Sequence, residues 1–245
     1  MYLSFGLEYA NMIATGNPFL SAYFQSDWFG KGIFWGLFIL SALCWVIVLY
    51  KSWQFWAVRK LSSHFFDQFG EKKDDPLNLQ WNRPISSRIG EIPNPLFEIY
   101  RAVKQQTLQL MSRNHQARTT LSGSDIELIE SQVTASMSSA CKKLDKHIFV
   151  LSMIVTLAPF LGLLGTVWGI LLTFSQLQGG LQSSNASMLS GLSMALATTV
   201  LGLLVAIPAL IGHSYLKNAE RETRRDMETF SHTLLAAIEL QYRRE

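Results

Sequence analysis

The chain has 245 residues, of which 49% are hydrophobic and only 16% are charged. Its length alone suggests one or two soluble domains, but most of the apolar excess lies in three long stretches that overrule this expectation. The net charge of +3 comes without interleaved basic and aromatic residues, which argues against a nucleic-acid surface. The two cysteines and five histidines show no metal-ligand spacing, and no nucleotide loop or nucleophile motif is present. We therefore predict neither an enzyme nor a metal or cofactor site.

Three apolar segments without Asp, Glu, Lys or Arg are predicted to cross a membrane, at residues 32–50, 148–174 and 191–212. About 20 apolar residues span a bilayer core, so the second segment must tilt or reach the headgroups. The first segment has no polar face, unlike a core helix of a soluble protein. The first 30 residues contain no Lys or Arg, so the basic region of a signal peptide is missing.

The remaining parts of the chain, taken in order, read mostly as helix. An outer segment at 1–31 contains a short amphipathic helix rich in aromatics near Phe19–Phe29, and a helical region at 51–147 follows the first span. Within it, the first span continues to about Phe69, a loop covers 70–95, and an amphipathic helix starts at Pro95 with apolar positions up to Leu108 and Met111. A capping sequence at Ser122–Asp125 opens a further helix, which is expected to run unbroken into the second span. A loop at 175–190 precedes the third span, and a helix at 213–245 extends it.

The basic residues predict the orientation. Of the 21 Lys and Arg residues, 20 lie within 51–147 and 217–245, and only Lys31 lies elsewhere. The positive-inside rule places 51–147 and 213–245 in the cytoplasm, and 1–31 and 175–190 on the outer side. The predicted fold is an all-α membrane protein with three transmembrane helices, long cytoplasmic helical extensions, and apolar helix sides that favour an oligomer.

Small and hydroxyl-bearing residues distinguish the two later spans. Gly162, Gly165 and Gly169 share one face of the second span, where Thr166 is expected to donate a hydrogen bond to the Gly162 carbonyl. The third span carries a single stripe of small residues: Ala195, Thr199, Gly202, Ala206 and Ala209. These patterns fit either close helix packing or a hydroxyl-lined channel. Because no ionisable carboxylate or amine lies inside a span, proton conduction would require a titrating group from a partner.

The sequences APFLGLLGTVWGI and ALATTVLGLLVAIPA, the latter from Ala195 to Ala209, resemble the signature of the TolQ/ExbB/MotA proton-channel family. The resemblance implies a bacterial inner-membrane ring, a homo-pentamer, around a single-span TolR/ExbD-like partner whose membrane aspartate is protonated. It also implies a TolA/TonB-like periplasm-spanning partner and puts residues 1–31 and 175–190 in the periplasm. Proton flow would then drive mechanical work on the cell envelope.

The resemblance assigns roles to individual residues. Thr166 and Thr199 match the family's pore threonines, and Pro208 matches its proline. Members similar to TolQ and ExbB commonly carry a glutamate five residues before the second threonine, where this chain has Met194, a pore-wall candidate. Gly162, Gly165, Gly169, Gly202 and Pro208 are assigned to helix packing.

Four functions remain open from the sequence. The overall layout favours a TolQ-like subunit that works on the cell envelope. The alternatives are an ExbB-type motor for outer-membrane uptake, a non-conducting scaffold of the same fold, which Met194 would suit, and a flagellar stator, for which the chain is short.

Overall fold

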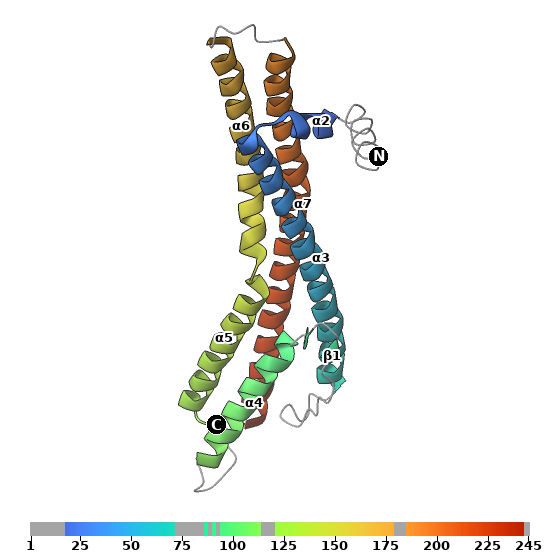
Figure 1. Cartoon of the computed structure of the whole chain (residues 1–245). Helices are drawn as coiled ribbons and strands as arrows, with labels where there is room; N and C mark the ends of the chain where they lie inside the picture. The colour runs from blue at the N-terminus through green and yellow to red at the C-terminus, as the bar shows by residue number, and fades with distance from the viewer. Residues whose placement is uncertain are drawn as a thin grey trace. The chain divides into compact units, whose positions relative to one another are not determined.

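The computed structural model describes residues 18–71, 86–87, 90–91, 94–113, 121–178 and 185–242. It consists of helices α2 (Pro18–Gln25), α3 (Trp28–Glu71), α4 (Pro95–Arg113), α5 (Gly123–Asp145), α6 (Ile148–Gln178) and α7 (Asn185–Tyr242), as Figure 1 shows. Between α3 and α4 lies a short antiparallel pairing of β1 (Ser86–Ser87) with β2 (Gly90–Glu91). Most of the predicted loop at 70–95 is outside the described residues.

The prediction of an all-α membrane protein is confirmed. Three described helices are long and apolar enough to cross a membrane, and they contain the three predicted spans. The short aromatic helix is α2, the first span and its extension form the single helix α3, and the third span and C-terminal stretch form the single helix α7. Two compact units divide the chain: an apolar unit of residues 1–49 and 147–214, and a polar unit of residues 50–146 and 215–245.

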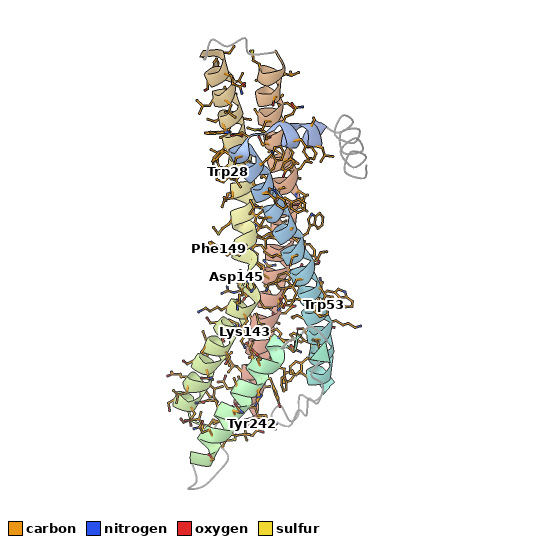
Figure 2. The ribbon with its side chains drawn as sticks, in the orientation of Figure 1. Trp28, Trp53, Lys143, Asp145, Phe149 and Tyr242 are labelled. Carbon is orange, nitrogen blue, oxygen red and sulfur yellow. The ribbon has the colours of Figure 1, made fainter. Side chains whose placement is uncertain are left out.

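In the apolar unit, α6 and α7 run side by side and the first part of α3 packs with them (Figure 1). Their outward faces carry exposed large apolar side chains, among them Phe38 on α3, Phe160 on α6 and Leu196 on α7. Phe149, labelled in Figure 2, likewise projects away from α6. So much exposed apolar surface requires lipid or neighbouring helices as its surroundings.

An aromatic cluster forms the core of the polar unit. The ring of Phe65 on α3 lies 6.0 Å from that of Tyr100 on α4 and 5.3 Å from that of Phe230 on α7, measured between centroids. Phe69 adds a further edge-to-face contact with Phe230 at 5.2 Å. Because aromatic side chains bury a large area and favour this geometry, the cluster joins three helices that are distant in sequence.

Ion pairs at the surface of the polar unit connect α5 to α4 and to α7. Lys143 of α5 approaches Glu98 of α4 at 2.8 Å, and Lys217 of α7 approaches Asp145 of α5 at 2.8 Å. Lys143 and Asp145 are labelled in Figure 2. Exposed pairs of this kind each contribute little, whereas the buried aromatic rings remove a large apolar area from water.

The amphipathic helix expected from Pro95 is α4, and the predicted apolar positions Leu96, Ile99 and Val103 are buried. The buried face differs from the prediction only in the last turns. Leu108 is 48% exposed, whereas Thr107 and Leu110 are buried. Thr107 is tolerated inside because its hydroxyl donates to the Val103 carbonyl at 2.9 Å. The apolar pattern therefore placed the end of the stripe one residue out of register, at 108 and 111 instead of 107 and 110.

The expected unbroken helix from Ser122 into the second span is wrong, although its start is confirmed. Ser122 and Asp125 form a reciprocal capping box, but α5 ends at Asp145 and α6 begins at Ile148. His147 has a φ of 76°, a left-handed conformation that interrupts the helix. Near this end the Lys51 side chain, 2% exposed, donates from Nζ to the Leu144 carbonyl at 3.0 Å and so satisfies a terminal carbonyl of α5.

Candidate functional site

The pairing of α6 and α7 depends on glycines at several levels. A Cβ atom added at Gly202 would lie 2.7 Å from the Ala158 carbonyl oxygen, and one at Gly162 would lie 3.0 Å from the Thr198 carbonyl oxygen. At the other end of the pair, a Cβ at Gly169 would lie 2.6 Å from the Gly191 carbonyl oxygen. The two backbones are therefore in direct contact, an arrangement that small residues permit between helices in lipid.

Two other residues predicted to pack differ in their surroundings. A Cβ at Gly165 would collide with the Thr198 side chain, so Gly165 also belongs to the α6–α7 contact. Pro208 lies inside α7 and is half-buried.

Thr199 links the two helices through its hydroxyl. Its Oγ1 donates to the Gly162 carbonyl of α6 at 3.2 Å and also lies 3.3 Å from the Ala195 carbonyl of its own helix. The residue is half-buried. Since a hydroxyl oxygen keeps lone pairs while its proton is donated, Thr199 can still accept a hydrogen bond from an acid or a water molecule.

Thr166 behaves differently from the sequence prediction. Its Oγ1 donates to the Leu163 carbonyl at 2.6 Å, one residue nearer than the expected Gly162 carbonyl. The Gly162 carbonyl instead accepts the bond from Thr199. Thr166 is half-buried, and its oxygen is likewise left with accepting capacity.

Thr198 was missed by sequence reasoning, which selected its neighbour from the TT pair by resemblance. It is fully buried, and its Oγ1 lies 3.0 Å from both the Met194 and Ala195 carbonyls of the preceding turn. Its side chain fills the space that Gly165 leaves on α6. The signal that could have identified Thr198 is Gly165, because a small residue on one helix of a packed pair leaves room for a side chain from the other helix.

Met194 lies in the core of the apolar unit. Its side chain is 2% exposed and belongs to a cluster with Ala22 of α2, Phe34 of α3 and Ala197 of α7. A Cβ at Gly30 would collide with the Met194 sulfur. These contacts give Met194 a packing role between three helices, and its role as a pore-wall residue stays a prediction.

Asp27 was also overlooked. Its Oδ2 accepts a hydrogen bond from the indole Nε1 of Trp168 on α6 at 3.0 Å, and its Oδ1 accepts one from the backbone N–H of Gly30 at 2.9 Å. The Trp168 ring also lies 4.4 Å from that of Phe29 between centroids. The sequence assigned Asp27 to the outer segment at 1–31, but the structure places its carboxylate against the second apolar stretch.

Within the described ranges, no three His, Cys, Asp or Glu side chains are grouped so that they could hold a metal ion. The site therefore consists of hydroxyls, glycines and one carboxylate on closely packed apolar helices. Such a site can accept and donate hydrogen bonds along a helix pair.

The fold and the site define a helical membrane protein with a hydroxyl-bearing, glycine-packed helix pair. Residues 99–229, more than half of the chain, match the MotA/TolQ/ExbB proton channel family. The chain belongs to this family of proton channels, which confirms the predicted resemblance and the transport class rather than an enzyme.

Individual relatives agree with this assignment. The biopolymer transport protein ExbB of Neisseria gonorrhoeae is 24% identical over 83% of this chain and 89% of its own length. The ExbB protein of Aquifex aeolicus is 42% identical over 36% of this chain and 59% of its own length. The Tol-Pal system protein TolQ of Haemophilus influenzae is 30% identical over 39% of this chain and 42% of its own length. The family and the three apolar helices support a bacterial inner-membrane protein.

Proposed function

We propose that this chain is the proton-channel subunit of an inner-membrane motor that converts the proton-motive force into mechanical work at the cell envelope. The observation that carries the proposal is the position of Thr199, whose hydroxyl bridges α7 to α6 inside a stretch without any acid. Thr166 supplies a second hydroxyl on α6. Both oxygens can accept a hydrogen bond from a protonated acid or a water molecule.

The proposal includes a partner that brings the acid. The spans at 32–50, 148–174 and 191–212 contain no Asp or Glu, whereas a proton relay needs a titratable group at membrane depth. A single-span TolR/ExbD-like protein with a membrane aspartate would supply it at the centre of a pentamer of this chain. A TolA/TonB-like protein would carry the movement across the periplasm.

The proposed orientation follows the basic residues. Residues 1–31 and 175–190 face the periplasm, and residues 51–147 and 213–245 face the cytoplasm, where 20 of the 21 Lys and Arg residues lie. Lys51, Lys143 and Lys217 lie in the polar unit.

Two roles within the family remain to be separated. The sequence layout favours a TolQ-like role in envelope maintenance, while the match to the Neisseria ExbB protein over 83% of the chain favours an ExbB-type role in outer-membrane uptake. Expression in bacterial strains that lack either TolQ or ExbB, each supplied with the cognate single-span partner of this chain, separates them. Restored resistance to detergent supports the TolQ-like role, and restored uptake supports the ExbB-type role.

Conduction is tested with the chain and its single-span partner in liposomes that contain a pH-sensitive dye. Thr199→Val and Thr166→Val keep the side-chain shape and remove the hydroxyl, so each should lower proton flux, and the double variant should lower it at least about tenfold. Thr156→Val is the matched control, since Thr156 lies on α6 and donates to the Met153 carbonyl at 2.9 Å in the same local pattern as Thr166.

Two outcomes contradict the conducting role. One is wild-type flux in a correctly assembled double threonine variant, which favours the non-conducting scaffold. The other is a full-rate proton leak through rings that lack the partner, because it would remove the need for a borrowed acid.

A further inference from the structure

An apolar groove lies in the apolar unit between α2, α3 and α7. Its volume is about 480 Å³, and its lining includes Tyr23 of α2, Phe34, Phe38 and Ser41 of α3, and Leu204 of α7. The helix α2 turns away from the axis of α3 (Figure 1). A mostly apolar hollow of this size with a few polar groups has the character of a ligand site.

The groove has a buried floor and exposed walls. Of the residues that line it, Leu37 and Val205 are 2% and 9% exposed, whereas Phe38 and Leu204 are 66% and 55% exposed. The walls belong to helices that are long and apolar enough to cross a membrane. The open side of the groove therefore faces acyl chains rather than water.

The dimensions of the groove suit an extended chain rather than a helix. Its lining residues on α3 run from Phe34 to Ser41, about 10 Å at helical rise. Spread over this length, the volume corresponds to a cross-section of roughly 45 Å², whereas a helix 10 Å across needs about 80 Å². A helix from a second copy of this chain would not fit inside, but an acyl chain would, because it is much thinner.

A single cation lies beyond one end of the groove. Lys31 is the only Lys or Arg in the described part of the apolar unit, residues 18–49, 147–178 and 185–214. It precedes Phe34 and Trp35 by one helical turn, so it lies on the same face of α3 as the groove lining. Lys31 is half-buried, and among the described residues its ammonium has no ion-pair partner within 4.0 Å.

The neighbouring polar groups indicate the level of Lys31. Asp27, one turn earlier, directs its carboxylate elsewhere, since its Oδ2 accepts the indole N–H of Trp168 at 3.0 Å. One turn after Lys31, the indole N–H of Trp35 donates to the Tyr23 hydroxyl at 3.3 Å. Tryptophan and tyrosine concentrate at the level of the lipid headgroups, which is where a phosphate group is found.

We propose that this groove is a phospholipid site, in which an acyl chain lies against Phe34, Phe38 and Val205 and the phosphate group binds the Lys31 ammonium. The proposal joins the two features of the groove, an apolar channel about 10 Å long and one cation at its headgroup end. Because three helices line the groove, the bound lipid holds α2 against α3 and α7. The site lies apart from Thr166 and Thr199 and does not depend on proton conduction.

The site is tested with phosphatidylglycerol that carries a photoreactive diazirine in one acyl chain, added to the full-length protein purified in detergent with its single-span partner. Illumination should attach the lipid to peptides of α2, α3 and α7 that line the groove, and excess unlabelled phosphatidylglycerol should suppress this labelling. Labelling that unlabelled lipid does not suppress overturns the proposal. So does the absence of labelling from the assembled protein, because it would mean that a neighbouring copy covers the groove.

The apolar part of the site is tested by filling its deep end. Ser41→Phe places a ring at the end of the groove away from Lys31, and displacing two methylene groups of the lipid should lower its affinity about tenfold. Leu43→Phe is the matched control, since Leu43 is 44% exposed on the same helix and does not line the groove. Both variants should keep the thermal unfolding midpoint of the wild type. Equal labelling of the two variants overturns the proposal.

The phosphate contact is tested by competition in the same labelling assay. Lys31→Gln should weaken binding of phosphatidylglycerol about fivefold, the scale of one cation at an anionic headgroup, and Lys31→Arg should retain it. Diacylglycerol has the same chains without a phosphate, so it should compete about fivefold less well in the wild type and equally well in Lys31→Gln. Equal competition by both lipids in the wild type overturns the role of Lys31. Since the assay reports binding, its result is independent of what Thr199→Val does to proton flux.

Discussion

Gly202→Ala should destabilise the α6–α7 pair, although alanine is the better helix former. The added Cβ would lie 2.7 Å from the Ala158 carbonyl oxygen and 3.2 Å from the Gly162 Cα atom. Ordinary contacts of this kind lie at about 3.5–4.0 Å. Because both partners are backbone atoms of α6, no side-chain rotation relieves the overlap, and the helices must move apart by roughly 0.5–1 Å.

The expected cost follows from two opposing effects. Overpacking costs about 1–3 kcal/mol, and separation also weakens the Thr199 bond to Gly162, so we take the upper value. The helical preference of alanine over glycine returns about 1 kcal/mol. The net result is a loss of about 2 kcal/mol in the free energy of unfolding.

Gly32→Ala is the control for this measurement, since a Cβ at Gly32 meets no heavy atom within 4 Å. Gly32→Ala gains the same helical preference of alanine over glycine, but its Cβ overlaps no other atom. It should therefore leave the free energy of unfolding unchanged or raise it by up to about 1 kcal/mol. Both variants are compared with the wild type by denaturant titration in detergent micelles, followed by circular dichroism. A Gly202→Ala variant at least as stable as Gly32→Ala would refute the close backbone contact.

Two further predictions concern α5. Ser122→Ala removes the side chain that accepts from the Asp125 N–H, so the first turn of α5 should lose about 1 kcal/mol of protection in hydrogen exchange. Ser138→Ala, at an exposed position of the same helix, is the control and should keep this protection. Equal protection in both variants would contradict the capping role. Burial raises the pKa of the Cys141 thiol, with the Arg224 guanidinium opposing this shift, so in a Cys44→Ser background the thiolate fraction at neutral pH is reduced. Maleimide should then react more slowly with Cys141 than with a small free thiol. As the pH is raised, the reaction rate should keep increasing beyond the usual titration range of a thiol, and a plateau of the rate within that range would contradict this.

Much of the fold could be predicted because its signals are local. Apolar stretches longer than a bilayer core define three helices, and the absence of Gly and Pro after residue 213 predicts the long end of α7. The Ser122–Asp125 box marks the start of α5 for the same reason, since a cap acts within one turn.

The break before α6 could not be predicted, because it depends on the conformation of a single histidine in a segment without Gly or Pro. His147 adopts a left-handed φ where glycine or asparagine is the usual signal. Lys51, from a helix nearly a hundred positions earlier, binds the Leu144 carbonyl near that end. Such long-range capping leaves no trace in a local pattern.

The candidate site was predictable only in part. The glycine and threonine positions follow from spacing and resemblance, but hydrogen-bond partners depend on the register between α6 and α7, which placed Gly162 opposite Thr199. Asp27 was missed because a linear division assigns residues before a span to the outside. The hydrogen bond from Trp168 to Asp27 shows that Asp27 lies beside the second apolar stretch, and only such a tertiary contact reveals this position.

The helices differ in how they continue between the two units. The backbone hydrogen bonds of α7 run from Asn185 to Tyr242 and those of α3 from Trp28 to Glu71, whereas α5 and α6 are separated at Lys146 and His147. A run of helical hydrogen bonds stiffens the backbone it spans, and α3 and α7 each carry such a run from residues of one unit into residues of the other. At Lys146 and His147 the helical hydrogen bonds are interrupted, so a change of direction there needs only a few backbone dihedral angles to change.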